Sequence, residues 1–206
     1  MARRVYGLDP SFTSSGLSDG VNHIIINTKP EDSISPLGDT SRRLSVILLQ
    51  IEQFVNKQRD RDFVIYVESA MLNGAMAHHL YEMGMYYMAL YNMFSEHRLR
   101  FITPAALKKQ ISGKGNASKN HDAATCGVGT KPKCVTCAAR DIHGITFDKD
   151  IGKDKLHAYF LWKIGMDIEA GITEYKPLAR RGKGKQRKCK TKPIETTKQS
   201  LTKAVI

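Results

Sequence analysis

Three acidic side chains stand where a folded chain could bring them together around a divalent cation. Asp9 follows a short strand expected over Arg3 to Leu8, and Glu68 follows the apolar run Phe63 to Val67. Asp154 lies on a helix expected late in the chain. Hard cations such as Mg²⁺ prefer oxygen ligands and share their remaining positions with water and phosphate. Two such ions can activate a water and stabilise the leaving oxygen during phosphodiester cleavage.

The acidic residues differ in how strongly they indicate a metal site. An aspartate before a proline, as at Asp9-Pro10, is often only a turn former. Glu68 is the sharper indicator, because a charged residue that closes a buried strand loses its hydration unless a cation or hydrogen-bond donors meet it. His157 lies one turn after Asp154 on the same side of the late helix, so it is a further candidate ligand. The alternative for His157 is a hydrogen-bonded histidine of the core.

A second group of ligand types lies in the stretch His121-x4-Cys126-x7-Cys134-x2-Cys137. Three cysteines with a nearby histidine make up the ligand set of a closed, tetrahedral, structural Zn²⁺ site. We favour His121 over His143 as the fourth ligand. Metal-free thiols in a reducing compartment are the alternative, and a disulfide framework is not expected.

The chain also contains the patterns of the elements that would position these side chains. Residues 23 to 27 are expected to form a strand that pairs with the first one as a hairpin, with residues 11 to 16 as a polar turn. Residues 28 to 38 read as a loop. A further strand is expected over residues 99 to 102, and helices are expected from residues 39 and 40 to 55, over 75 to 96, from 105, over 138 to 143 and over 153 to 166.

The helix expected over residues 75 to 96 carries two apolar stripes, and one sheet face cannot bury both. Six of the eight methionines of the chain fall between residues 71 and 93, which suits an adaptable packing surface. Either this helix is shared between the core and a partner subunit, or it is a fully buried central helix.

Length and charge narrow the class of protein. A chain of 206 residues fits one domain, and its net charge of +12 with a pI near 9.6 favours nucleic acid as the partner. Residues 176 to 206 are expected to be a disordered basic tail, whose charge could instead serve only solubility. No apolar run approaches the ~20 residues of a membrane span, and no signal peptide is recognisable, so a cytoplasmic protein is expected.

Three ordered motifs carry a resemblance to a known family. They are the string Gly7-Leu8-Asp9-Pro10-Ser11-Phe12-Thr13-Ser14-Ser15-Gly16, the strand ending in Glu68 before a glycine-containing turn, and Pro104-x-x-x-Lys108-Lys109 leading to Gly113-Lys114-Gly115-Asn116-Ala117-Ser118-Lys119. Together they resemble the RuvC-type Holliday junction resolvases, most closely the phage-encoded relatives. A phage origin would place the protein in the host cytoplasm.

The resemblance implies an α/β fold of the RNase H-like type, with a mixed five-stranded sheet flanked by helices, and we expect this domain to span residues 1–175. The Cys-rich stretch at about residues 120–137 departs from the family and is expected to be a small insertion that binds zinc. The resemblance further implies a homodimer, which we expect to form through the helix over residues 75–96. The implied activity is the resolution of Holliday junctions and other branched DNA by paired nicks. The implied cofactor is Mg²⁺, or Mn²⁺, with two ions per site.

By position, Asp9 and Glu68 match the first two acids of the family, and Asp154 and His157 match its final pair. A histidine stands where an aspartate is usual. We favour coordination of the metal by His157 as a neutral imidazole, and Asp150 is the substitute if His157 does not bind.

The resemblance also implies roles for basic and small residues. Lys108 and Lys119 match catalytic positions near the scissile phosphate, whereas the expected DNA contacts are Lys109, Lys114, Gly113, Gly115 and Phe12. Glycines let a backbone approach phosphates closely, and an aromatic can stack on an opened base. A solvated basic loop is the alternative for the lysines.

Three other functions remain open on the sequence. One is a nuclease for forks, flaps or RNA:DNA hybrids, and another is a non-catalytic junction-binding protein. The third is an actin-like phosphate-binding ATPase, which also begins with a strand, an aspartate and a Ser/Thr/Gly turn. That class needs a second phosphate loop, and none is found in the sequence.

Overall fold

The computed structural model describes residues 3–56, 62–70, 77–118, 126–127, 133–145 and 153–174, and the structural description is confined to them. Their strands form one five-stranded mixed sheet in the order β3-β2-β1-β4-β5. β1, β4 and β5 run parallel, whereas β2 is antiparallel to both β1 and β3. The strands are β1 (Arg4–Asp9), β2 (Ser14–Ser18), β3 (His23–Asn27), β4 (Phe63–Glu68) and β5 (Leu99–Ile102).

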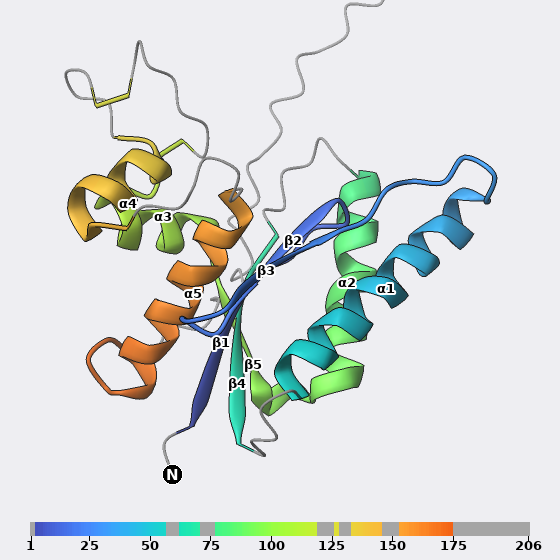
Figure 1. Cartoon of the computed structure of the whole chain (residues 1–206), viewed down its shortest axis with the longest axis horizontal. Coiled ribbons are helices and arrows are strands. Elements are labelled where there is room, and N and C mark those ends of the chain that lie inside the picture. Colours follow the sequence, from blue (N-terminus) through green and yellow to red (C-terminus); the bar gives the residue numbers. More distant parts are fainter. Residues whose placement is uncertain are drawn as a thin grey trace, which may run out of the picture.

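Helices cover both faces of this sheet. Figure 1 shows α1 (Pro36–Asn56) and α2 (Ala77–Phe94) on one side, and α5 (Lys153–Glu169) with α3 (Pro104–Ser112) and α4 (Val135–His143) on the other. A short 3₁₀ turn, η1 (Glu96–Arg98), precedes β5. The expected α/β fold with a five-stranded sheet flanked by helices is therefore confirmed.

The two faces of the sheet pack into separate hydrophobic cores, because successive residues of a strand point to opposite sides. Leu8 of β1 and Val67 of β4 belong to the core under α1 and α2. Val5 and Tyr66 belong to the core under α3, α4 and α5. The residue that follows Leu8 or Val67 therefore faces α5.

The polar turn expected over residues 11 to 16 is wrong from Ser14 onward, where the chain enters β2. Gly16 pairs with Asp9, and the next residue, Leu17, is fully buried. The Ser15 hydroxyl donates a hydrogen bond to the Ser11 carbonyl at 2.6 Å and lies 3.1 Å from the Tyr86 hydroxyl. A serine-rich segment can thus form a central strand, because tertiary contacts satisfy its polar groups.

Several helices differ in their bounds from the expectation. α1 already begins at Pro36, α4 begins at Val135, and α5 continues to Glu169. The structure also decides between the two alternatives for α2. One stripe of α2 is buried, whereas Tyr81, Met88 and Tyr91 are exposed, so the fully buried central helix is wrong.

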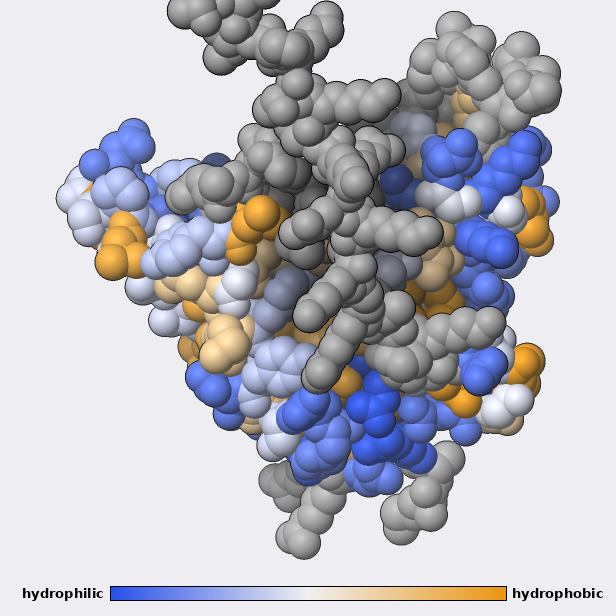
Figure 2. Space-filling view, turned by 180° about the vertical axis from the view of Figure 1, so that it is seen from behind, coloured by the Kyte–Doolittle hydropathy of each residue, from blue (hydrophilic) through white to orange (hydrophobic). Residues whose placement is uncertain are grey.

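Figure 2, seen from behind, shows hydrophilic side chains on the side of α3 and α4 and along the lower edge, with apolar patches on both sides of the molecule. Within the described ranges, no helix is both long and apolar enough to cross a membrane. The basic tail expected over residues 176 to 206 and much of the expected insertion lie outside the described residues.

Candidate metal centre

Asp9 and Glu68 end two neighbouring parallel strands on the same face of the sheet. The β1 and β4 pairing aligns Leu8 with Val67, so each acid is the next residue of its strand. His157 of α5 faces them. Its Nδ1 lies 2.9 Å from Glu68 Oε2 and 3.4 Å from Asp9 Oδ2. One ligand atom from each of the three residues lies within 4.8 Å of the others. The structure therefore brings together three of the expected ligands from distant parts of the sequence.

Burial removes most of the water that would otherwise stabilise the charges of this cluster. Asp9 is 6% exposed, Glu68 is 7% exposed and His157 is fully buried. Two carboxylates taken out of water repel each other and need a compensating positive charge or donors. The His157 Nδ1 lies close to both carboxylates, and a divalent cation between the three side chains would supply the charge. Carboxylate oxygens with an imidazole nitrogen form a donor set that fits such a cation.

Two glycines allow α5 to lie directly on the sheet. A Cβ at Gly7 would lie 2.0 Å from the Ala158 carbonyl oxygen, and a Cβ at Gly16 would lie 2.1 Å from the Asp154 carbonyl oxygen. Any side chain at these positions would therefore push the helix away. The close approach places the turn of α5 from Asp154 to Ala158, which includes His157, beside the acid at the end of β1.

The cluster opens into a pocket of about 350 Å³. Asp154, the fourth expected ligand, lines this pocket, although it is not part of the three-ligand group. Lys108 reaches the pocket from the first turns of α3. The full lining is Asp9, Pro10, Ser11, Glu68, Ser69, Ala70, Met83, Tyr87, Pro104, Lys108 and Asp154.

Tyr87 is a site residue that the sequence pattern did not reveal, because it occupies a position of an apolar helical stripe. Its hydroxyl donates a hydrogen bond to the Glu68 backbone carbonyl at 3.0 Å. Burial and the negative charges of Glu68 and Asp9 raise the pKa of Tyr87 above its usual value. Tyr87 therefore remains a neutral donor that holds the end of β4.

Phe12 does not occupy the position expected of a residue that stacks on DNA. It is 6% exposed and packs edge-to-face against Tyr86, with ring centroids 5.8 Å apart. The buried Arg43 guanidinium donates to the Phe12 carbonyl at 2.7 Å, and the Thr28 hydroxyl donates to the same oxygen. The expectation of a DNA contact at Phe12 is corrected, because its side chain anchors the turn after Asp9 in the core.

The remaining basic and glycine positions surround the end of α3. Lys109 and Lys114 are exposed, and neither lines the pocket. Gly113 adopts a left-handed conformation with φ of 75° and ends α3. This conformation favours glycine at a helix end without any contact to DNA. Gly115 lies close to α3, since a Cβ there would be 3.0 Å from the Ala105 carbonyl oxygen. The other expected site residues, Lys119, His121 and Asp150, lie outside the described residues.

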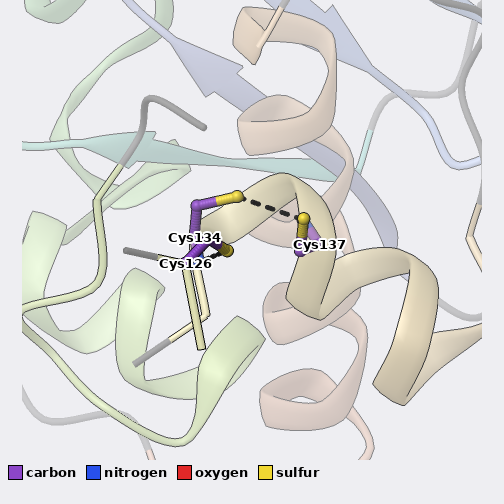
Figure 3. Close-up of side chains that lie close together, drawn as sticks. All are labelled: Cys126, Cys134 and Cys137. Atoms are coloured by element: carbon purple, nitrogen blue, oxygen red, sulfur yellow. Dashed lines mark hydrogen bonds between the residues drawn. The ribbon is translucent and has the colours of Figure 1, made fainter. Parts of the chain in front are cut away.

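A separate cluster of three cysteines lies at the start of α4. Figure 3 shows Cys126, Cys134 and Cys137 with their sulfur atoms turned toward one another, and these atoms all lie within 4.8 Å of each other. Burial and hydrogen bonds with the neighbouring thiols raise the pKa of Cys137 to about 12. His143 is not part of this cluster. Its Nε2 contacts the Ile111 carbonyl at 3.0 Å, and its ring packs against Phe160.

Comparisons with known proteins agree with the fold. No protein-family model matches the chain, and no curated protein does. Two solved structures of RuvC from Thermus thermophilus are similar to it. The complex with a Holliday junction substrate has a TM-score of 0.55 and 17% identity, and the other structure has a TM-score of 0.53 and 20% identity. Each match covers 84% of this chain and 99% of the RuvC chain. The chain therefore has the RNase H-like fold of the RuvC Holliday junction resolvases.

Proposed function

We propose that this protein is a divalent-metal-dependent endonuclease that resolves four-way DNA junctions by paired nicks. One observation carries the proposal. The buried Asp9, Glu68 and His157 converge beside a pocket that Lys108 and Asp154 also line. This arrangement puts metal ligands and a cation around one open space, which is what a scissile phosphate requires. The RuvC complex that shares the fold contains a Holliday junction substrate, which supports branched DNA as the substrate class.

The donor set suits two Mg²⁺ or Mn²⁺ ions. Asp9, Glu68, Asp154 and His157 are the residues that would hold them, since three are clustered and Asp154 lines the same pocket. When bound, such ions supply Lewis acidity that activates a water and offsets charge on the leaving oxygen. Asp150 stays a substitute ligand on the sequence alone.

The other pocket residues bind and orient the DNA strand. The Lys108 ammonium group offsets negative charge on the phosphate that enters the pocket. Tyr87 keeps the Glu68 backbone in place through its hydrogen bond. Lys109 and Lys114 are exposed beyond the pocket, where they can contact the phosphate backbone without reading bases. Lys119 would extend this basic segment.

The exposed stripe of α2 is the surface that we assign to dimer formation. Tyr81 is 54% exposed, Met88 is 62% exposed and Tyr91 is 36% exposed, all on one helix. Apolar side chains gathered on a surface helix are typical of protein interfaces. A two-fold dimer through α2 would provide two metal centres, one for each of two opposing strands.

The decisive experiment compares the full-length protein with its Asp9→Asn variant on labelled four-way junction, three-way junction, fork and duplex DNA, with and without Mg²⁺. We expect paired nicks in the four-way junction only with the metal, and no cleavage by the variant. Glu52→Gln is the matched control, because Glu52 is an exposed carboxylate on α1. It should cleave at the normal rate.

Binding separates the proposal from its alternatives. Asp9→Asn should still bind the junction in a gel-shift assay, because the exposed lysines are unchanged. Undiminished cleavage by Asp9→Asn would refute the assignment of the site. A wild-type protein that binds but never cleaves would instead indicate a junction-binding protein, and preferred cleavage of forks or flaps would redefine the substrate.

A further inference from the structure

The three-cysteine cluster at the start of α4 has no part in the proposed cleavage reaction. We propose that Cys126, Cys134 and Cys137 bind a structural Zn²⁺ ion. The site would hold α4 against α3 and so support the element that carries Lys108. This proposal does not depend on the proposed nuclease function, because it concerns a different set of ligands.

The geometry of the sulfur atoms supports a metal. Tetrahedral zinc with Zn–S bonds of ~2.3 Å places its sulfur ligands roughly 3.8 Å apart. The three Sγ atoms already lie within 4.8 Å of one another. Small side-chain rotations are therefore sufficient to bring all three to bonding distance. The side chains of Cys134 and Cys137 are held close by the three-residue spacing at a helix start, and Cys126 joins them from a segment earlier in the chain.

Backbone hydrogen bonds orient two of the three sulfur atoms. The Cys134 N–H donates to Cys126 Sγ at 3.1 Å, and the Cys137 N–H donates to Cys134 Sγ at 3.4 Å. Such bonds orient metal-ligating sulfurs and disperse their negative charge. Cys134 is also the N-cap residue of α4, so the positive end of the helix faces the site. Lys133 and Arg140 also interact electrostatically with the cluster, and the Asp141 carboxylate, which pairs with both, offsets part of their charge.

A redox-active pair is the main competing explanation for a Cys-x2-Cys sequence at a helix start. That chemistry uses two thiols, whereas here a third converges on the same point. All three are thiols rather than disulfides. Soft thiolate ligands select zinc over the hard cations that suit the carboxylate cluster. The third sulfur therefore favours zinc.

The contacts of α4 indicate what the metal would stabilise. The Val135 N–H donates to the Ser118 carbonyl at 2.9 Å. Ala138 of α4 belongs to the same hydrophobic core as Leu107 and Ile111 of α3. A zinc ion would tie the segment that contains Cys126 to this helix pair. Because Lys108 follows Leu107 on α3, a looser α4 would also loosen one wall of the pocket.

Metal content of the full-length protein, purified under reducing conditions without chelators, is the first measurement. We expect about one zinc per chain, and we expect its loss in Cys137→Ser. Cys189→Ser is the matched control, because Cys189 is the remaining cysteine of the chain and lies far in sequence from the Cys-rich stretch. It should keep its zinc.

The wild-type protein reconstituted with Co²⁺ gives a second readout that needs no variant to fold. Thiolate-to-cobalt charge-transfer absorption with intense d–d bands is expected for a tetrahedral sulfur-rich site. Absence of both stoichiometric zinc and this spectrum would overturn the proposal, as would a native disulfide between Cys134 and Cys137 detected by mass spectrometry. Asp9→Asn should retain its zinc even if cleavage is lost, so the two proposals can fail separately.

Discussion

Replacement of Gly16 by alanine tests the idea that the absence of a side chain at this position of β2 lets α5 place its proposed metal ligands, Asp154 and His157, beside Asp9. The new Cβ would lie 2.1 Å from the Asp154 carbonyl oxygen, well under the 3.0 Å below which real Cβ contacts essentially do not occur. The obstacle is backbone, which cannot rotate away as a side chain can. The helix must therefore retreat by about 0.9 Å, and Asp154 and His157 move with it.

Two effects of this retreat can be estimated. Overpacking of this kind costs ~1–3 kcal/mol of unfolding free energy. For a chain of this size that corresponds to a fall in Tm of roughly 2–12 °C. A displacement of about 1 Å at a catalytic group lowers the rate by about 100-fold, so junction cleavage should fall by two orders of magnitude. Mg²⁺ added at high concentration should recover little of the lost rate, because the ligands themselves are displaced.

The assay combines calorimetry with cleavage of a four-way junction, and Gln53→Ala is the control. Gln53 is exposed on α1, outside the pocket lining and outside the exposed stripe of α2. This variant should keep the wild-type rate, and its unfolding free energy should change by no more than ~0.5 kcal/mol. If Gly16→Ala keeps both the wild-type Tm and the wild-type rate, then α5 does not lie on β2 as described.

Three further changes test other parts of the structure. Lys108→Ala should lower the cleavage rate by about 100- to 1,000-fold with little loss of junction binding, since it removes a charge at the phosphate. Lys29→Ala, which removes an exposed lysine outside the pocket, should retain the rate, and equal rates for the two variants would contradict the role of Lys108. Met88→Glu should convert the proposed dimer to monomers in analytical ultracentrifugation, because it would place a charge in the proposed apolar interface. Leu49→Glu on the exposed face of α1 should leave this dimer intact, and an unchanged sedimentation profile for Met88→Glu would exclude α2 as the interface. His121→Ala should reduce the zinc content measured by mass spectrometry if His121 is the fourth ligand, and an unaltered content would assign that position to another group.

Much of the secondary structure can be predicted from local patterns in the sequence. The continuous apolar run of β4 and the helical spacing of apolar residues in α1 are visible in the local sequence. Both elements were therefore predicted with small errors at their ends. β2 was missed, because its segment is rich in serine and its stability comes from pairing with β1 and β3. The burial of Phe12 was also missed, because it depends on contacts with residues far away in the sequence. No local pattern reveals that the Arg43 guanidinium and Tyr86 enclose it.

The sequence by itself determined which residues could ligate metals and that Asp9 and Glu68 close strands. Their convergence was decided by the tertiary structure, through the parallel register that aligns Leu8 with Val67 and turns both acids toward α5. The tertiary structure also brought His157 within 2.9 Å of Glu68, because Gly7 and Gly16 leave room for the helix backbone. Strand register and helix approach depend on contacts between residues far apart in the chain, which local periodicity does not encode.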